Sequence, residues 1–206
     1  MVLLSTAFCP PVEYFALLAG ETDVELEACE SYSKQSWRNR CRILSENGPL
    51  ELIVPVVHGG WDRITDVRVE YSTPWVPKME KAISSAYDSS PFFEFYRDEF
   101  FAILDSEPER LWDLDLQIIR WLCRKAGIAA EIRFTSGYAS AGASSRPDIR
   151  DMRGTIHPKR SNTILADLGL GKPYWQVFNQ KFGFTPGLSM LDLLFNEGPD
   201  SMLWLK

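Results

Sequence analysis

The sequence has few of the residues that commonly bind metals or form disulfides. Its 206 residues include two histidines, His58 and His157, and four cysteines, no two of which form a CxxC pair. Scattered cysteines are typical of reduced thiols, so we expect a cytoplasmic protein. A zinc site would need acidic ligands beside the two histidines. We therefore expect neither a metal ion nor another cofactor.

The chain also lacks an excess of basic residues. Lysine and arginine number 22 against 28 aspartates and glutamates, which gives a net charge of -6 and a pI near 5.1. Domains that bind nucleic acids are usually basic, so we expect no nucleic-acid partner.

Long apolar runs and several catalytic motifs are missing as well. Residues 1–20 imitate a signal peptide, but Glu13 interrupts the run and no lysine or arginine precedes it. No other run approaches the ~18 apolar residues of a membrane span, so we expect none. The GxGxxG, GxxxxGKS/T and GxSxG patterns are absent, which leaves a phosphate-cradle loop and a triad hydrolase without support.

What the chain does have is the composition of a globular protein, with 45% hydrophobic and 24% charged residues. Without internal repeats or an obvious linker, residues 1–206 are predicted to form a single domain. Residues 2–5 and 24–28 read as strands on either side of a helix over residues 11–20. This unit favours a parallel pair of strands. We predict an α/β fold with a mainly parallel, Rossmann-like sheet, an inserted β-hairpin and a helical segment.

The hairpin is predicted from Asn47-Gly48, because both central positions of a type I′ turn need a positive φ. This turn would pair Ile43 with Leu52 and Cys41 with Val54. Residues two apart share a strand face, so one face would carry five polar residues, four of them cationic: Lys34, Ser36, Arg38, Arg40 and Arg42. Such a row repels itself unless an anion or acidic side chains lie against it. The row therefore indicates an anionic ligand, or else ion pairs with Glu30, Glu46 and Glu51.

Further elements follow from local patterns. We predict strands over residues 64–71, 132–136 and 174–178, and helices over 75–87, 90–104 and 111–122. Gly127 should end the last of these helices. Aromatic residues nearly surround the 90–104 helix, so it should be well buried. Ser189 should cap a last helix, which Gly198-Pro199 would end.

Candidate acid/base residues flank a stretch of small residues over 137–146. That loop is either a mobile lid carrying Asp148 and Arg150 or an ordinary surface loop. His157 has the ordinary pKa range of a general base, and Lys159 beside it could extend an anion site. The alternative is a surface histidine and a lysine that faces water. We take Asp148 and His157 as catalytic candidates, and Arg150 and Lys159 as substrate-binding candidates.

The first helix supplies two more candidates. Glu13 and Tyr14 lie close to its positive N-terminal end, where a carboxylate is stabilised. Glu13 is therefore either a helix-end acid or, with Tyr14, part of a substrate site.

Four segments together resemble the WbqC-like family of bacterial proteins: PPVEYF at 10–15, KQSWRNRC at 34–41, YWQVF at 174–178 and the run from Leu188 to Pro199. The resemblance extends from about residue 8 to the end. Members of that family lie in O-antigen and other surface-polysaccharide gene clusters, and a glycine-transferring role has been proposed for some. The resemblance identifies Asn39 and Arg40 with the family's paired Asn-Arg, but implies no nucleophile or general base. Longer relatives have a second α/β half that this chain shortens.

The resemblance and the cation row together predict a transferase that takes an activated, anionic donor, either a nucleotide-sugar or an activated amino acid. Lys34, Arg38 and Arg40 would hold the donor's phosphate or carboxylate. Gln35 and Asn39 would join them only where the strand ends or bulges, because they otherwise face the opposite side. The alternative is a non-catalytic binding or assembly protein that uses the Arg38, Arg40 and Arg42 face to hold an anionic partner.

Overall fold

The computed structural model describes residues 1–60, 62–138 and 149–206. Its main sheet is parallel, in the order β5-β2-β1-β6. The strands are β1 (Val2–Leu4), β2 (Asp23–Leu26), β5 (Glu131–Phe134) and β6 (Arg150–Asp151). Helix α1 (Val12–Gly20) connects β1 to β2, which confirms the predicted strand-helix-strand unit. All three residues of β1 are buried, as expected for an inner strand covered on both faces.

The hairpin forms a separate antiparallel sheet of β3 (Arg40–Ser45) and β4 (Gly48–Ile53). Its register differs from the predicted one by two residues, because Glu46 and Asn47 form the turn and Gly48 already pairs with Ser45. The Ser45 hydroxyl fixes the turn at this position: it donates to the carbonyl oxygen of Gly48 at 2.7 Å and accepts from the amide of Asn47 at 3.3 Å. An even shift leaves each side chain on its predicted face, so Cys41 and Ile43 are still buried.

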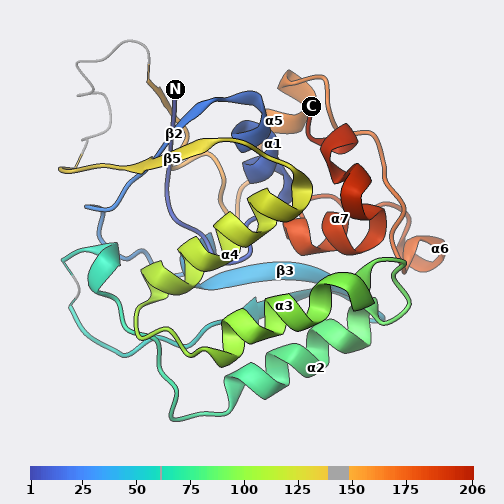
Figure 1. Ribbon diagram of the computed structural model, residues 1–206, viewed down its shortest axis with the longest axis horizontal. Coiled ribbons are helices and arrows are strands. Elements are labelled where there is room, and N and C mark those ends of the chain that lie inside the picture. The colour runs from blue at the N-terminus through green and yellow to red at the C-terminus, as the bar shows by residue number, and fades with distance from the viewer. Residues whose placement is uncertain (61, 139–148) are drawn as a thin grey trace.

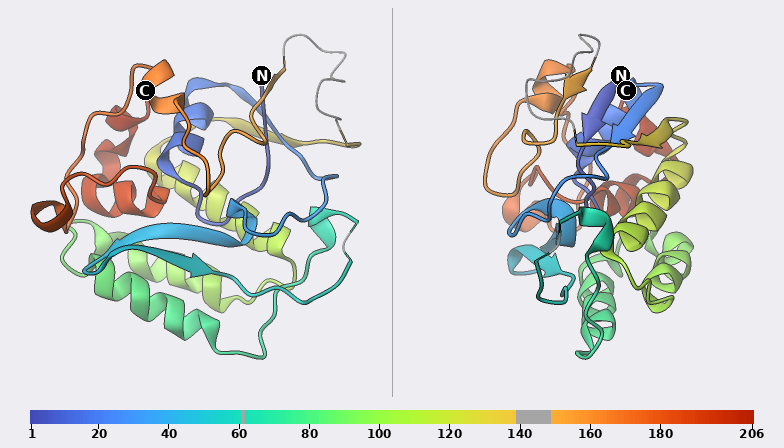
Figure 2. Two further views of the ribbon diagram at one scale, coloured as in Figure 1. Left: turned by 180° about the vertical axis from the view of Figure 1, so that it is seen from behind. Right: turned by 90° about the vertical axis from the view of Figure 1, so that its left-hand side faces the viewer.

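The helical segment lies against the hairpin (Figures 1 and 2). It consists of α2 (Trp75–Tyr87), α3 (Phe93–Asp105) and α4 (Leu111–Ala126). Helix α2 has the predicted bounds, and Gly127 ends α4 with a φ of 73°. Helix α3 starts later than predicted, because the Ser90 hydroxyl donates to the side chain of Asn196 at 3.0 Å instead of capping α3. Phe95 on α3 is 74% exposed, so the aromatic residues of this helix are not all buried.

Two predicted strands are wrong. Residues 64–71 begin with a 3-10 helix, η2 (Ile64–Asp66), and continue with isolated bridges. Residues 174–178 are irregular and precede α6 (Asn179–Phe182). This part of the chain also contains α5 (Ile164–Asp167), α7 (Met190–Glu197) and the 3-10 helix η3 (Gly198–Trp204). The Ser189 hydroxyl accepts from the Leu191 amide at 3.2 Å, which confirms the predicted cap of α7.

Hydrogen bonds to the side chain of Asp192 in α7 hold residues 174–178 without the backbone hydrogen bonds of a strand. Its carboxylate accepts hydrogen bonds from the Tyr87 hydroxyl at 2.8 Å, the Tyr174 hydroxyl at 2.7 Å and the Gln176 amide at 2.9 Å. Side chains therefore fix this segment to α2 and α7. Burial raises the pKa of Asp192 to about 6.

Buried apolar residues of the sheet, the hairpin and the helices form one continuous cluster. Within the described ranges, every helix is too short or too polar to cross a membrane.

Candidate functional site

The carboxyl edge of the parallel sheet is the first place to look for a site. The chain leaves β1 toward β2 on one side, while β6 pairs with β1 on the other, which makes a topological switch point between β1 and β6. Ligands of open α/β sheets bind outside the carboxyl ends of the strands at such points. A cavity of about 30 Å³ lies there, the switch-point cavity, and its lining includes Ser5, Thr6, Arg38, Arg153 and His157.

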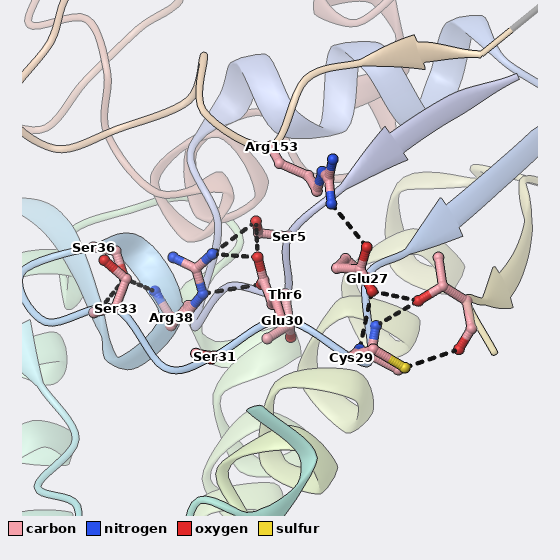
Figure 3. A network of polar contacts seen from close by, with 12 residues as sticks. Ser5, Thr6, Glu27, Cys29, Glu30, Ser31, Ser33, Ser36, Arg38 and Arg153 are labelled. Atoms are coloured by element: carbon pink, nitrogen blue, oxygen red, sulfur yellow. Dashed lines mark hydrogen bonds and ion pairs between the residues drawn. The ribbon is translucent and has the colours of Figure 1, made fainter. Parts of the chain in front are cut away.

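Two ion pairs stabilise this edge (Figure 3). The Arg38 guanidinium contacts both carboxylate oxygens of Glu30, with Nε to Oε1 at 3.0 Å, and also donates to the Ser5 hydroxyl at 2.9 Å. Arg153 Nη1 lies 2.8 Å from Oε2 of the fully buried Glu27. The edge therefore presents arginines whose charges are matched by carboxylates.

Asp115 lies beneath the cavity on α4 and is fully buried. The Thr6 hydroxyl donates to its Oδ2 at 3.1 Å. Burial holds the pKa of Asp115 well above its usual range.

A larger opening adjoins the switch-point cavity and shares Trp37 and His157 with it. This basic cleft has a volume of about 570 Å³. Its polar wall comes from α1, from β3 and from the segment after β6: Glu13, Arg42, His157, Lys159, Arg160 and Asn162. The Arg42 guanidinium lies 5.4 Å from the centre of the Trp37 ring, so this cation is held in a defined orientation.

Glu13 is the acidic residue of the cleft wall. It is 7% exposed, and its Oε1 accepts from the Asn162 amide at 3.2 Å. Its Oε2 is buried and has no hydrogen-bond partner in residues 1–60, 62–138 and 149–206. Burial raises the pKa of Glu13. A carboxylate with a raised pKa is a better proton acceptor, so Glu13 has the character of a general base.

His157 has a defined tautomer. Its Nδ1 accepts from the Lys159 amide at 3.1 Å, so the proton of the neutral ring lies on Nε2. Burial lowers the pKa of His157, and the charges of Arg160 and Lys159 add to the effect. The imidazole is therefore suited to donate a hydrogen bond from Nε2 rather than to accept a proton.

The cation row is only partly formed. Trp37–Asn39 is a 3-10 helix, η1, so Arg38 lies outside β3 and the prediction that it shares a strand face with Arg40 and Arg42 is wrong. The Ser36 hydroxyl accepts from the Arg38 amide at 3.5 Å and caps η1. Arg40 and Arg42 both pair with Glu51, at 3.1 and 3.2 Å.

The alternative prediction of ion pairs is confirmed for Glu30 and Glu51. For Glu46, the backbone carbonyl oxygen accepts a hydrogen bond from the Lys181 ammonium at 2.6 Å instead.

Four of the predicted substrate-binding residues line a third opening, the hairpin recess, of about 500 Å³: Lys34, Gln35, Asn39 and Arg40. Asn39 ends η1 and Arg40 begins β3, so both line one recess at the strand's end, as a shared site requires. The Lys159 ammonium donates to the Gln35 side chain, which joins this recess to the basic cleft.

The remaining predicted residues lie elsewhere. Tyr14 lines the switch-point cavity, and its hydroxyl donates to the Ser5 carbonyl oxygen at 3.0 Å. Arg150 is exposed in β6, where it pairs in register with Val2. Asp148 lies outside the described residues, so its role stays a prediction.

Sequence reasoning missed several polar residues of the sheet edge. Ser5, Thr6 and Glu27 directly follow buried strands, which was a usable signal. Asp115 interrupts the apolar stripe of α4, and a buried charge in such a stripe also suggests a special environment. Arg153 had no local signal, because its partner Glu27 is distant in sequence.

Comparison with known proteins gives one family and one relative. The model of the WbqC-like protein family matches residues 6–160. The chain is also similar to the uncharacterized protein Rv1507c of Mycobacterium tuberculosis, with 24% identity over 230 residues that cover 100% of this chain and 97% of the relative. No solved structure matches. The family match includes Glu13, Arg42 and His157 of the basic cleft and ends before Asn162.

Proposed function

Because the chain belongs to the WbqC-like protein family, we propose that it is a transferase of bacterial surface-polysaccharide biosynthesis. Its donor would be an activated, anionic molecule, a nucleotide-sugar or an activated amino acid. The transferred group would be a sugar or a glycyl or other aminoacyl group. The polysaccharide setting comes from the family resemblance. The single observation that supports the chemistry is the basic cleft, whose lining includes three cationic side chains and a buried carboxyl group.

Arg42, Lys159 and Arg160 would bind the anionic part of the donor. Guanidinium groups bind phosphate or carboxylate through paired, charge-assisted hydrogen bonds, which also orient the anion. Arg42 is best placed for this role, because the Trp37 ring limits its motion and its partner Glu51 is 38% exposed. An exposed ion pair is weak, so an incoming anion can replace Glu51 at little cost.

Glu13 would act as the general base. Its carboxylate would take the proton of an acceptor hydroxyl or amine while that group attacks the electrophilic carbon of the donor. The bond from that carbon to the donor's phosphate oxygen breaks, and its electron pair stays on the phosphate. The cations of the cleft then stabilise the leaving charge, and His157 Nε2 donates a hydrogen bond to it. Asp148 is retained as a predicted acid/base residue.

The alternative is a non-catalytic protein that binds an anionic partner on this face. One observation favours it: Arg40 and Arg42 share the single carboxylate of Glu51, which leaves one positive charge for a partner. Arg38 would not contribute, because the carboxylate of Glu30 already matches its charge. Product formation separates the two hypotheses, since the alternative predicts binding without turnover for every donor and acceptor.

Calorimetric titration with UDP-N-acetylglucosamine tests the donor site. Arg42→Ala should weaken binding by about tenfold or more, the effect of losing a charge-assisted hydrogen bond of roughly 1.5–3 kcal/mol. The matched control is Arg68→Ala, because Arg68 is 59% exposed and pairs with Glu109 outside the cleft. Unchanged affinity of a folded Arg42→Ala variant would contradict the proposed donor site.

A further inference from the structure

Two consecutive residues in the lining of the hairpin recess each have a buried polar atom without a partner. Asn39 Oδ1 and Arg40 Nε are buried, and neither has a hydrogen-bond partner in the part of the chain that the structure describes. Both residues line the recess, together with Tyr32, Lys34, Gln35 and His58. Buried polar atoms are nearly always hydrogen-bonded, so an adjacent unpaired donor and acceptor need an explanation.

The hydrogen bonds of the other side-chain atoms show that one of the two unpaired atoms is an acceptor and the other a donor. Asn39 is 5% exposed, and its Nδ2 donates to the Val54 carbonyl oxygen at 2.8 Å, so the unpaired atom of its amide is the oxygen, an acceptor. Arg40 uses Nη1 to pair with Glu51 at 3.1 Å, which leaves Nε–H as an unpaired donor. The recess therefore offers one acceptor and one donor from consecutive residues.

This combination selects a particular kind of ligand group. A phosphate or carboxylate can only accept hydrogen bonds, so it would leave Asn39 Oδ1 unpaired. An ammonium group can only donate, and it would leave Arg40 Nε unpaired. A hydroxyl group donates one hydrogen bond and accepts others, so one hydroxyl satisfies both atoms.

The rest of the recess suits the body of a sugar. Pro55 and Val56 add apolar surface to the lining, and the Tyr32 ring offers a flat face. Sugar rings carry hydroxyl groups at their edge and C–H groups on their faces, which match a polar and an apolar wall respectively. We propose that the hairpin recess binds a neutral sugar ring, with one hydroxyl between Asn39 Oδ1 and Arg40 Nε.

The lining of the recess alone supports the sugar-binding site. The inference that the bound sugar accepts the transferred group rests on the proposed function. The Lys159 to Gln35 hydrogen bond makes the recess and the basic cleft neighbours. A donor in the cleft and a sugar in the recess would then be bound side by side, as a two-substrate transfer requires.

Two arginine-to-lysine variants test the proposal. Arg40→Lys keeps a cation for Glu51 but removes Nε–H. The matched control is Arg68→Lys, which also keeps a cation for its partner Glu109 but lies outside both the recess and the basic cleft. The probes are N-acetylglucosamine and methyl α-glucoside, with binding followed by saturation-transfer NMR and by the Asn39 side-chain amide signals of labelled protein. Thermal melting checks that each variant is folded.

We expect saccharide binding to the wild-type protein, a loss of about tenfold or more in affinity in Arg40→Lys, and no change in Arg68→Lys. The Asn39 signals should shift with saccharide and not with inorganic phosphate. The inference is overturned if neither saccharide binds, if Arg40→Lys binds as well as the wild type, or if phosphate competes for the recess.

Inorganic pyrophosphate, titrated in parallel, reports on the basic cleft alone. If the wild-type protein binds pyrophosphate but neither saccharide, only the recess is refuted. If it binds a saccharide but not pyrophosphate, only the donor site of the proposed function is refuted.

Discussion

Replacement of Asp192 by asparagine should change how the stability of the protein depends on pH. Asp192 is 1% exposed and accepts hydrogen bonds from Tyr87, Tyr174 and Gln176. Burial raises the pKa of its carboxyl from 3.8 to about 6 in the folded protein, although the three hydrogen bonds act in the opposite direction. The folded state therefore holds a proton on Asp192 over a pH range in which the unfolded chain has released it.

The sign and size of the effect follow from this difference. A raised pKa in the folded state stabilises the protein fully below pH 3.8, and this stabilisation is lost as pH rises toward 6. The range spans about two pH units, and each unit is worth 1.36 kcal/mol, so the loss is about 3 kcal/mol. Above pH 6 no further change comes from this residue.

Urea unfolding of the wild type and of Asp192→Asn at pH values from 4 to 8 provides the measurement. Other titrating groups cancel in the difference between the two free energies of unfolding. We expect the wild type to lose about 3 kcal/mol relative to the variant between pH 4 and pH 7. Asp151→Asn is a control of opposite sign, because Arg153 lowers the pKa of Asp151 and its stabilisation is lost as pH falls. A difference for Asp192→Asn that stays constant with pH would refute the reasoning.

Two further substitutions test the packing and the ion pair described above. Gly198→Ala should destabilise by about 2 kcal/mol or more in urea unfolding, because Gly198 has a φ of +56° and an added Cβ would lie 2.5 Å from the Phe92 ring. Gly20→Ala, where a Cβ meets nothing within 4 Å of the described structure, should leave stability nearly unchanged, and equal effects of the two would contradict the packing argument. Glu30→Gln should cost about 3 kcal/mol, because it leaves the Arg38 charge, only 12% exposed, without its carboxylate. A melting temperature equal to that of the wild type would show that the pair contributes little.

The sequence predicted those parts of the fold whose signals are local. The unit β1-α1-β2, the bounds of α2 and the end of α4 at Gly127 each follow from apolar spacing and a terminating residue within one element. The predicted hairpin register was wrong by two residues, because the Ser45 hydroxyl favours a turn at Glu46-Asn47, one residue before Asn47-Gly48.

Elements fixed by distant side chains could not be predicted in this way. Residues 174–178 carry aromatic and β-branched side chains typical of a strand, yet Tyr174 and Gln176 bind Asp192 of α7 instead. Their partner lies more than fifteen residues away, and no local pattern indicates it. The same reason applies to Arg153 and Glu27 at the sheet edge.

The cations of the candidate site were visible in the sequence, but their division into separate openings was not. One strand carries Arg40 and Arg42 two residues apart, and the chain places one in the hairpin recess and the other in the basic cleft. That division depends on the segment after β6, in which the Pro158 carbonyl oxygen accepts from Arg42 at 3.3 Å and the Lys159 ammonium donates to Gln35. Contacts between segments so distant in the sequence cannot be predicted from apolar periodicity or from turn residues.

The balance of charge decides between the two interpretations of the cation row. Arg38 has a carboxylate of its own in Glu30, and both side chains are about nine-tenths buried, so this pair is complete without a ligand. Arg40 and Arg42 share Glu51, whose single negative charge cannot neutralise two guanidinium groups. Glu51 therefore leaves one positive charge without a neutralising partner of its own where the cleft and the recess meet. Since Glu51 is exposed and its pairs are weak, an anion at Arg42 would let Glu51 pair fully with Arg40. The structural interpretation thus fits Arg38, and the ligand-binding interpretation fits Arg42.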